Sequence, residues 1–168
     1  ADSLSAIKYA KVTPVRDETG LVVDYITEGD FPTYGNDDDR ADEIAAAIVH
    51  TVMSKIKEIP LYRDAVPTQS VLTITSNVVY GKATGSFPSG HKAGTPFAPG
   101  ANPENGVDNH GMLASMLSVG KLDYSDALDG ISLTNTITPS GLGRTKEEQV
   151  NNLVGILDAG FVPNDCCC

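Results

Sequence analysis

The fold class follows from a β-branched stretch in the middle of the chain, Ser70-Val71-Leu72-Thr73-Ile74-Thr75. Alternation along an extended chain places Leu72 and Ile74 on one face, whereas the other face carries Val71 and hydroxyl-bearing residues. A strand without charge on either face is typical of a sheet that is covered by helices. The stretch therefore predicts an α/β fold.

The clearest helical signal lies upstream of this strand and begins after Asn36. Asp37, Asp38 and Asp39 stand where the unpaired amides of a helix N-terminus favour acidic groups. Apolar residues then recur at helical spacing until Pro60 ends the helix. A metal site is the alternative interpretation of the aspartate run, and N-terminal capping explains the same residues more simply.

Further elements are expected on both sides of this pair, together with a long loop rich in Gly and Pro at residues 81–106. They are a short helix at 4–10 capped by Ser3, a hairpin at 14–26, a helix capped by Asp108 or Asn109 and ended by Gly120, a half-buried strand at 131–137, and a helix that opens with a Thr145–Glu148 capping box and ends near Gly160.

Charge and cysteine content exclude several classes of protein. The 168 residues carry 12 basic and 22 acidic side chains, a net charge of -10, which argues against binding to nucleic acid or to an anionic membrane surface. No apolar run approaches the roughly 18 residues of a membrane-spanning helix. The three cysteines, Cys166, Cys167 and Cys168, are adjacent and suit neither a disulfide framework nor a spaced zinc site. We therefore expect a cytoplasmic protein.

Among short motifs, Pro88-Ser89-Gly90-His91 is similar to a signature of the acid phosphatases related to vanadium haloperoxidases, in which the histidine polarises a phosphoryl group. The Arg-Pro and Ser-Arg pairs of that family are missing from this chain, so a phosphatase is retained only as an alternative. His50 is expected to be a satisfied residue on its helix. His50, His91 and His110 are far apart in sequence, and no metal site is predicted from them.

Longer blocks resemble pyruvate formate-lyase (formate C-acetyltransferase), a glycyl radical enzyme family. The resemblance runs in register from Ala1 to about Leu157, with a departure at 86–92. Its most specific part is the continuous segment from Tyr62 to Gly85, which includes the central strand, and further matching blocks lie at 93–103 and 129–132.

The resemblance implies a fragment from the C-terminal half of a longer enzyme. The family fold is a ten-stranded α/β barrel with the active site inside. Residues 1–160 are then an incomplete part of that barrel, and residues 161–168 are a divergent tail. The strand that carries Leu72 and Ile74 resembles a barrel strand of the family whose inward apolar side chains help to form the wall of the pyruvate pocket. We expect these two side chains to face substrate, and plain packing in the protein core is the alternative.

The family converts pyruvate and coenzyme A to acetyl-CoA and formate by radical chemistry. Its radical rests on a glycine in a loop like Arg-Val-Ser-Gly-Tyr, and an adjacent cysteine pair passes it to substrate. This chain contains no such loop and no cysteine before Cys166. We therefore expect no catalytic residue and no bound cofactor in this chain, and an inactive isolated chain.

The resemblance also implies partners, which are the rest of a homodimeric parent enzyme and a radical-SAM activating enzyme. Pyruvate and 2-ketobutyrate both remain open as the substrate of the parent. The alternative is a spare-part module that docks on a damaged glycyl radical enzyme.

Overall fold

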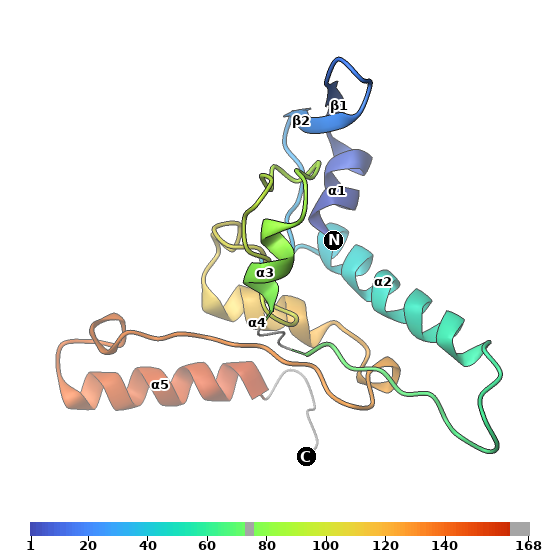
Figure 1. Cartoon of the computed structure of the whole chain (residues 1–168). Coiled ribbons are helices and arrows are strands. Elements are labelled where there is room, and N and C mark those ends of the chain that lie inside the picture. Colours follow the sequence, from blue (N-terminus) through green and yellow to red (C-terminus); the bar gives the residue numbers. More distant parts are fainter. Residues whose placement is uncertain (73–75, 162–168) are drawn as a thin grey trace.

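The computed structural model describes residues 1–72 and 76–161, and it arranges helices and one hairpin around a small core (Figure 1). The hairpin lies at the top of Figure 1, and the last helix extends to the lower left, away from the first two helices. The elements in chain order are α1 (Asp2–Tyr9), β1 (Lys11–Arg16), β2 (Val22–Glu28), α2 (Asp39–Lys57), α3 (Asn77–Lys82), α4 (Met112–Gly120), two 3₁₀ turns, η1 (Tyr124–Asp126) and η2 (Pro139–Gly141), and α5 (Lys146–Phe161).

Helix α1 starts earlier than expected, so the prediction that Ser3 caps it is wrong. The Ser5 amide bonds the Ala1 carbonyl at 3.0 Å and closes a first turn that already contains Ser3. The β1–β2 hairpin is confirmed, with Pro14 opposite Tyr25. Its turn is held by Asp17, whose Oδ1 accepts the Leu21 amide at 3.0 Å.

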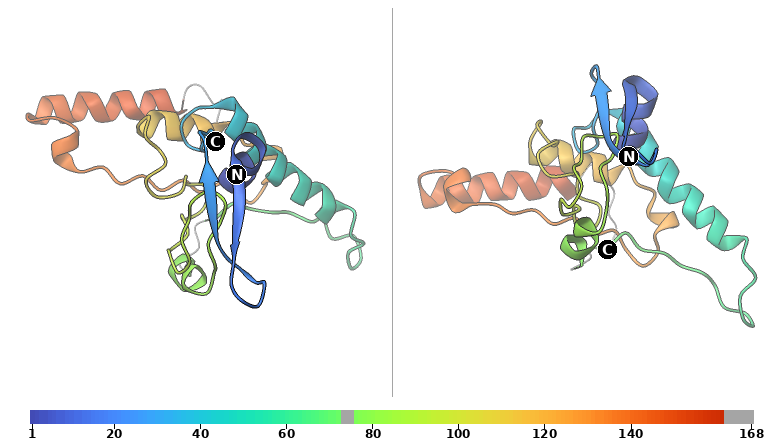
Figure 2. Two further views of the ribbon diagram at one scale, coloured as in Figure 1. Left: turned by 90° about the horizontal axis from the view of Figure 1, so that it is seen from above. Right: turned by 45° about the horizontal axis from the view of Figure 1, so that its top comes forward.

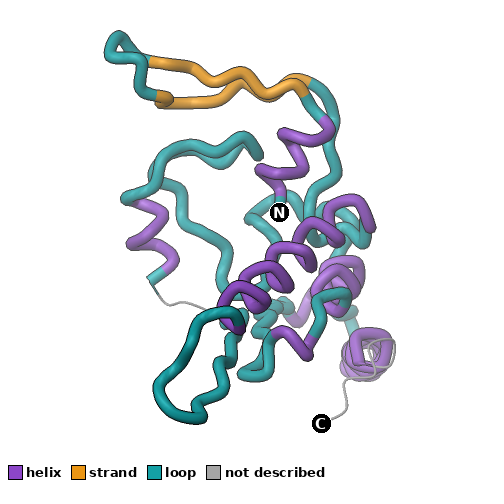
Figure 3. The backbone as a smooth tube through the Cα atoms, turned by 90° about the vertical axis from the view of Figure 1, so that its right-hand side faces the viewer, coloured by secondary structure: helices purple, strands orange, loops and turns teal. Residues whose placement is uncertain are grey.

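Helix α2 is confirmed, and its cap is Asp38, which accepts the Arg40 amide at 3.0 Å. The apolar stripe of α2 is only partly covered, because Ala41 and Met53 are buried whereas Ile48 and Val52 are exposed. The segment that follows α2 loops out past the helix end and returns to the middle of the molecule (Figures 1 and 3).

Among the described residues of the expected central strand, Val71 forms a parallel bridge with Ile131. The Val71 amide donates to Gly130 at 3.0 Å, and the Ser132 amide donates to Val71 at 2.7 Å. Thr73, Ile74 and Thr75 lie outside the described residues, and the strand expected at 131–137 is wrong beyond this bridge. The described residues therefore have mixed α/β content but form no closed barrel.

The core sits where α2, α4 and the long loop meet. Its buried members are Tyr34, Ala101, Val119 and Leu122, and Val49, Val71 and Ile131 are among the half-buried residues packed against it. The described parts of the expected strands that reach this core are thus the two bridge residues and Leu133.

The long loop is confirmed, and it is preceded by a helix, α3, that the sequence analysis did not predict. The Asn77 side chain bonds the Phe97 carbonyl at 2.8 Å, and this contact ties α3 to the loop. Helix α4 ends at Gly120 as expected. It begins after Gly111 rather than after Asp108 or Asn109, because the His110 amide is held by Asn36 Oδ1 at 3.0 Å.

Helix α5 opens with the predicted capping box and lies apart from the hairpin, α1 and α2 in all views (Figures 1 and 2). It contacts α4 closely at one point, since a Cβ at Gly160 would overlap the Met116 side chain. Its apolar stripe is exposed and consists of Val150, Leu153, Val154 and Leu157. Among the described helices, none has the length and apolar character to cross a membrane.

Candidate functional site

The segment with the predicted pocket wall is positioned by Gln69, which lies just before the bridge. Gln69 Nε2 donates to the Val49 carbonyl of α2 at 3.0 Å and to the Asp126 carbonyl of η1 at 2.7 Å. One amide group therefore fixes the start of the strand against two other elements. Sequence periodicity gave no signal for this role, because a polar residue before a strand is also typical of a loop.

Leu72, the described residue of the predicted pocket wall, is 52% exposed. It lies one residue after the bridge, on a strand whose described pairing is with the segment at 130–132. Ile74 lies outside the described residues, so the shared face of Leu72 and Ile74 stays a prediction. An exposed leucine beside a fixed bridge is typical of a surface that other parts of a larger protein cover.

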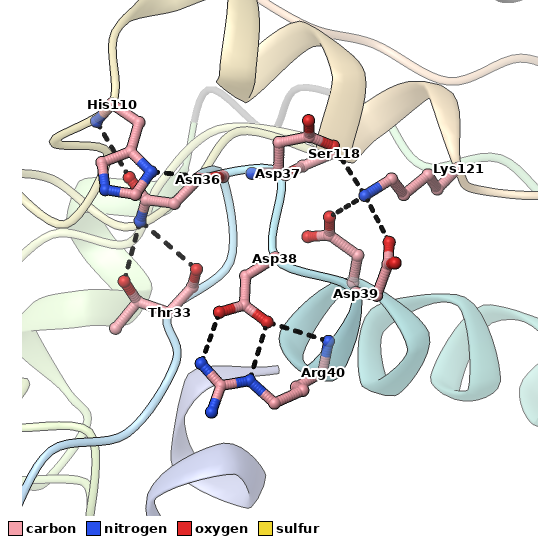
Figure 4. A network of polar contacts seen from close by, with 10 residues as sticks. Thr33, Asn36, Asp37, Asp38, Asp39, Arg40, His110, Ser118 and Lys121 are labelled. Carbon is pink, nitrogen blue, oxygen red and sulfur yellow. Dashed lines mark hydrogen bonds and ion pairs between the residues drawn. The ribbon is translucent and has the colours of Figure 1, made fainter.

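The aspartate run is part of a network of polar contacts that links the start of α2 to the residue after α4 (Figure 4). The Lys121 ammonium group, just after α4, lies 2.6 Å from Asp37, 2.7 Å from Asp39 and 2.9 Å from Asp42. Asp38 instead caps α2 and pairs with the Arg40 guanidinium at 2.7 Å. Capping thus accounts for one of the three aspartates, and a lysine from a distant part of the chain binds the other two.

Charge balance at this site favours a charged lysine. Desolvation lowers the pKa of Lys121, but the hydrogen bonds that its ammonium group donates to Asp37, Asp39 and Asp42 outweigh it, and the pKa lies well above its usual range. The ammonium group occupies the place that a cation would take among these carboxylates. Within the described ranges, no group of three or more His, Cys, Asp or Glu side chains has the geometry to hold a metal ion.

Asn36 joins this loop to the segment before α4 (Figure 4). Its Nδ2 donates to Thr33 Oγ1 at 2.9 Å and to the Val107 carbonyl at 2.7 Å. The His110 ring lies 3.1 Å from the Asn36 carbonyl, an acceptor, so Nδ1 of His110 carries a proton. His110 and Asn36 line an open cleft of about 290 Å³ with Arg40. These contacts hold the segment before α2 against the segment before α4.

His91, the histidine of the phosphatase-like motif, is largely buried and lies in a separate cavity. His91 Nδ1 lies 2.5 Å from Glu104 Oε1, and the His91 ring stacks on Phe87 and Phe97. Asp2 lines the same cavity of about 260 Å³. Burial is the largest influence on Asp2 and raises the pKa of its carboxyl group. Two carboxyl groups beside His91 make this cavity a poor binding site for a phosphate ester.

Two family models match the chain, one in its N-terminal half and one in its C-terminal half. Residues 1–81 match the model described as pyruvate formate lyase-like, and residues 97–167 match the model described as glycine radical. The chain therefore belongs to the pyruvate formate lyase-like, glycyl radical family. The family resemblance inferred from the sequence is confirmed.

Similar proteins agree with this assignment. The chain is 58% identical over 160 residues to the PFL-like enzyme TdcE of Escherichia coli and 56% identical over 161 residues to Formate acetyltransferase 1 of the same organism. The match covers 95% and 96% of this chain and 21% of each relative, so the chain spans about a fifth of the length of these relatives.

Solved structures give the same result at the level of fold. A glycyl radical enzyme from Archaeoglobus fulgidus matches 77% of the chain, which covers 17% of that protein, with a TM-score of 0.68 and 30% identity. Hydroxyproline dehydratase from Clostridioides difficile matches 79% of the chain, which covers 16% of that protein, with a TM-score of 0.70 and 29% identity.

Proposed function

We propose that this chain is a segment of a formate C-acetyltransferase, in which the whole enzyme converts pyruvate and coenzyme A to acetyl-CoA and formate. The observation that carries the proposal is the 56% identity to Formate acetyltransferase 1 along 96% of the chain. The expected barrel, homodimer, activating enzyme and cytoplasmic location belong to the same proposal.

The role of this segment is structural support for one side of the substrate pocket. The Val71–Ile131 bridge and the Gln69 contacts hold the strand start, and Leu72 presents an exposed apolar side chain beside them. Apolar walls exclude water, which would quench a radical intermediate. The described residues contain no cysteine, so they offer no thiol for radical transfer. Residues 97–167 match the glycine radical model, and we propose that the radical glycine itself and the cysteine pair lie in the remainder of the enzyme.

A chimera tests this proposal. Residues 1–157 replace the matching segment of Formate acetyltransferase 1, and the activated chimera is assayed without oxygen for acetyl-CoA and formate. We expect turnover from the chimera and none from residues 1–168 alone. Turnover by the isolated chain, or a folded and activated chimera without turnover, contradicts the proposal.

Side-chain variants of the chimera test the pocket wall. We expect Leu72→Ala to raise the KM for pyruvate several-fold through loss of apolar contact. Leu21→Ala is the matched control, because Leu21 is also exposed but lies beside the hairpin turn. Equal effects of the two variants exclude Leu72 from the pocket. The same assay with 2-ketobutyrate compares the two candidate substrates.

A spare-part module is the second candidate, and the exposed apolar stripe of α5 favours it. Such a module docks on a glycyl radical enzyme that lacks its own copy of this segment. We expect the chain to co-purify with Formate acetyltransferase 1 from which the matching segment is deleted, and not with the intact enzyme. No binding to the deleted enzyme rules out the module.

A further inference from the structure

A Ser–His–Asp arrangement lies on the surface of α2. His50 Nδ1 is 2.7 Å from Asp126 Oδ2, and His50 Nε2 is 3.4 Å from Ser54 Oγ. His50 and Ser54 stand one helical turn apart and share a face of α2. Asp126 is the last residue of η1, so tertiary packing brings it to this face.

The hydrogen bonds set the tautomer that general-base chemistry requires. The Asp126 side chain is 7% exposed, and its backbone is fixed by the Gln69 contact at 2.7 Å. An ionised carboxylate only accepts hydrogen bonds, so the proton of a neutral His50 ring lies on Nδ1. The lone pair of Nε2 then faces the Ser54 hydroxyl.

The Ser54 hydroxyl points to this imidazole and is reachable from solvent. Hydroxyls in or just after helices often bond the carbonyl four residues earlier, as Thr84, two residues past the end of α3, does with Tyr80 at 2.6 Å. Ser54 Oγ contacts the ring of His50 instead. The His50 side chain is 68% exposed, which leaves room for a small molecule beside both groups.

Two further charged groups surround the arrangement. Asp123 caps η1, where its side chain accepts the Ser125 amide at 2.8 Å, and this places a second carboxylate three residues before Asp126. Lys57 follows Ser54 by three residues on the same face of α2. Its positive charge would stabilise the oxyanion that forms on the carbonyl oxygen of an ester attacked by Ser54.

We propose that Ser54 is a nucleophile that accepts acyl groups from small activated esters. His50 is its general base, and Asp126 is a positioning residue. Ser54 Oγ bonds to the ester carbonyl carbon, its proton moves to His50 Nε2, and the carbon–oxygen bond to the alcohol breaks as the alcohol takes that proton. Water then attacks the acyl-serine with His50 as base, which releases a carboxylic acid and free Ser54.

The test uses the full chain with p-nitrophenyl acetate as the ester. Cys166, Cys167 and Cys168 are first replaced by alanine, since thiols react with the same ester. We expect nitrophenolate release and an acetyl group on Ser54, located by peptide mass spectrometry. Ser54→Ala and His50→Ala each lower the rate at least about tenfold. Ser140→Ala, at an exposed serine of η2, leaves the rate unchanged.

A positioning role for Asp126 has its own readout. We expect Asp126→Asn to lower the rate and to move the acidic limb of the pH–rate profile to lower pH, because a protonated imidazole loses its carboxylate partner. Full activity of Ser54→Ala, with loss in His50→Ala, assigns the reaction to a free imidazole and overturns the proposal. Acetylation only at lysine also overturns it. Neither outcome depends on the acetyltransferase proposal, which concerns other residues.

Discussion

The ammonium group of Lys121 lies 2.9 Å from Oδ2 of Asp42, a carboxylate whose side chain is 1% exposed. Among the described residues, Oδ1 of this carboxylate is a buried acceptor without a hydrogen-bond partner. Lys121 is therefore the principal compensation for a buried charge that joins the start of α2 to the end of α4.

Replacement of Lys121 by methionine tests this relationship. We expect Lys121→Met to lower the free energy of unfolding by about 2 kcal/mol, because Asp42 remains buried without its cation. The measurement is urea denaturation followed by circular dichroism. Lys11→Met is the control, since the Lys11–Glu28 pair is exposed and its loss is expected to cost less than about 0.5 kcal/mol. Equal losses in both variants contradict the prediction, and Asp42→Asn is expected to restore part of the loss in Lys121→Met.

A glycine of α3 tests the contact between this helix and the long loop. A Cβ at Gly81 would lie 2.7 Å from Pro96 Cα, where the loop backbone has no room to move. We expect Gly81→Ala to lower the free energy of unfolding by about 2 kcal/mol. Gly85→Ala is the matched control, because a Cβ there meets no atom within 4 Å, and its expected change is within about 0.5 kcal/mol. Thermal unfolding of both variants measures the difference. Similar unfolding midpoints would show that Gly81 of α3 is not packed against the backbone at Pro96.

The α5 capping box gives a pH dependence. Glu148 accepts the Arg144 amide at 2.8 Å and the Thr145 amide at 3.1 Å, and these backbone bonds lower the pKa of its carboxyl group from 4.5. A lowered pKa means that the contribution to stability is present above pH 4.5 and is lost as the pH falls through the folded-state value. We expect wild type to be more helical than Glu148→Gln at neutral pH, with the difference disappearing in acid.

Circular dichroism between pH 7 and pH 2 measures this difference. Glu147→Gln is the control, since Glu147 stands in the same first turn but the two amide bonds are made by Glu148. A constant gap between wild type and Glu148→Gln across this range, or an equal effect of Glu147→Gln, would show that the cap does not act through its carboxylate.

Elements defined by local sequence were predictable. Helix α2, the hairpin and α5 each carry their own start or turn signal, and each forms where those signals stand. The strands at 70–75 and 131–137 were not predictable in the same way, because a strand needs a neighbour to bond. Val71 and Ile131 form a parallel bridge, and the described residues of these two segments form little further strand pairing.

Polar partners from distant parts of the chain were the least accessible to sequence reasoning. From the sequence, Lys121 is expected to be a surface lysine that follows Gly120. Its neighbours in sequence do not indicate that it binds Asp37 and Asp39 at the start of α2. Glu104 likewise gives no sequence signal for its contact with His91. Such contacts depend on packing between segments, whereas the family resemblance depended on long blocks of identity and was confirmed.

The Val71–Ile131 bridge also bears on the order in which this chain folds. Its two sides are separated in sequence by α3, the long loop and α4. Formation of the bridge closes this whole segment into one large loop, and the bridge itself contributes two backbone hydrogen bonds. Loop-closure entropy grows with the length enclosed, and long-range contacts slow folding. The hairpin and the long helices rely on neighbours in sequence and form early. We therefore expect the bridge to close late and to limit the folding rate, so that kinetics followed at Val71 lag those followed at α2.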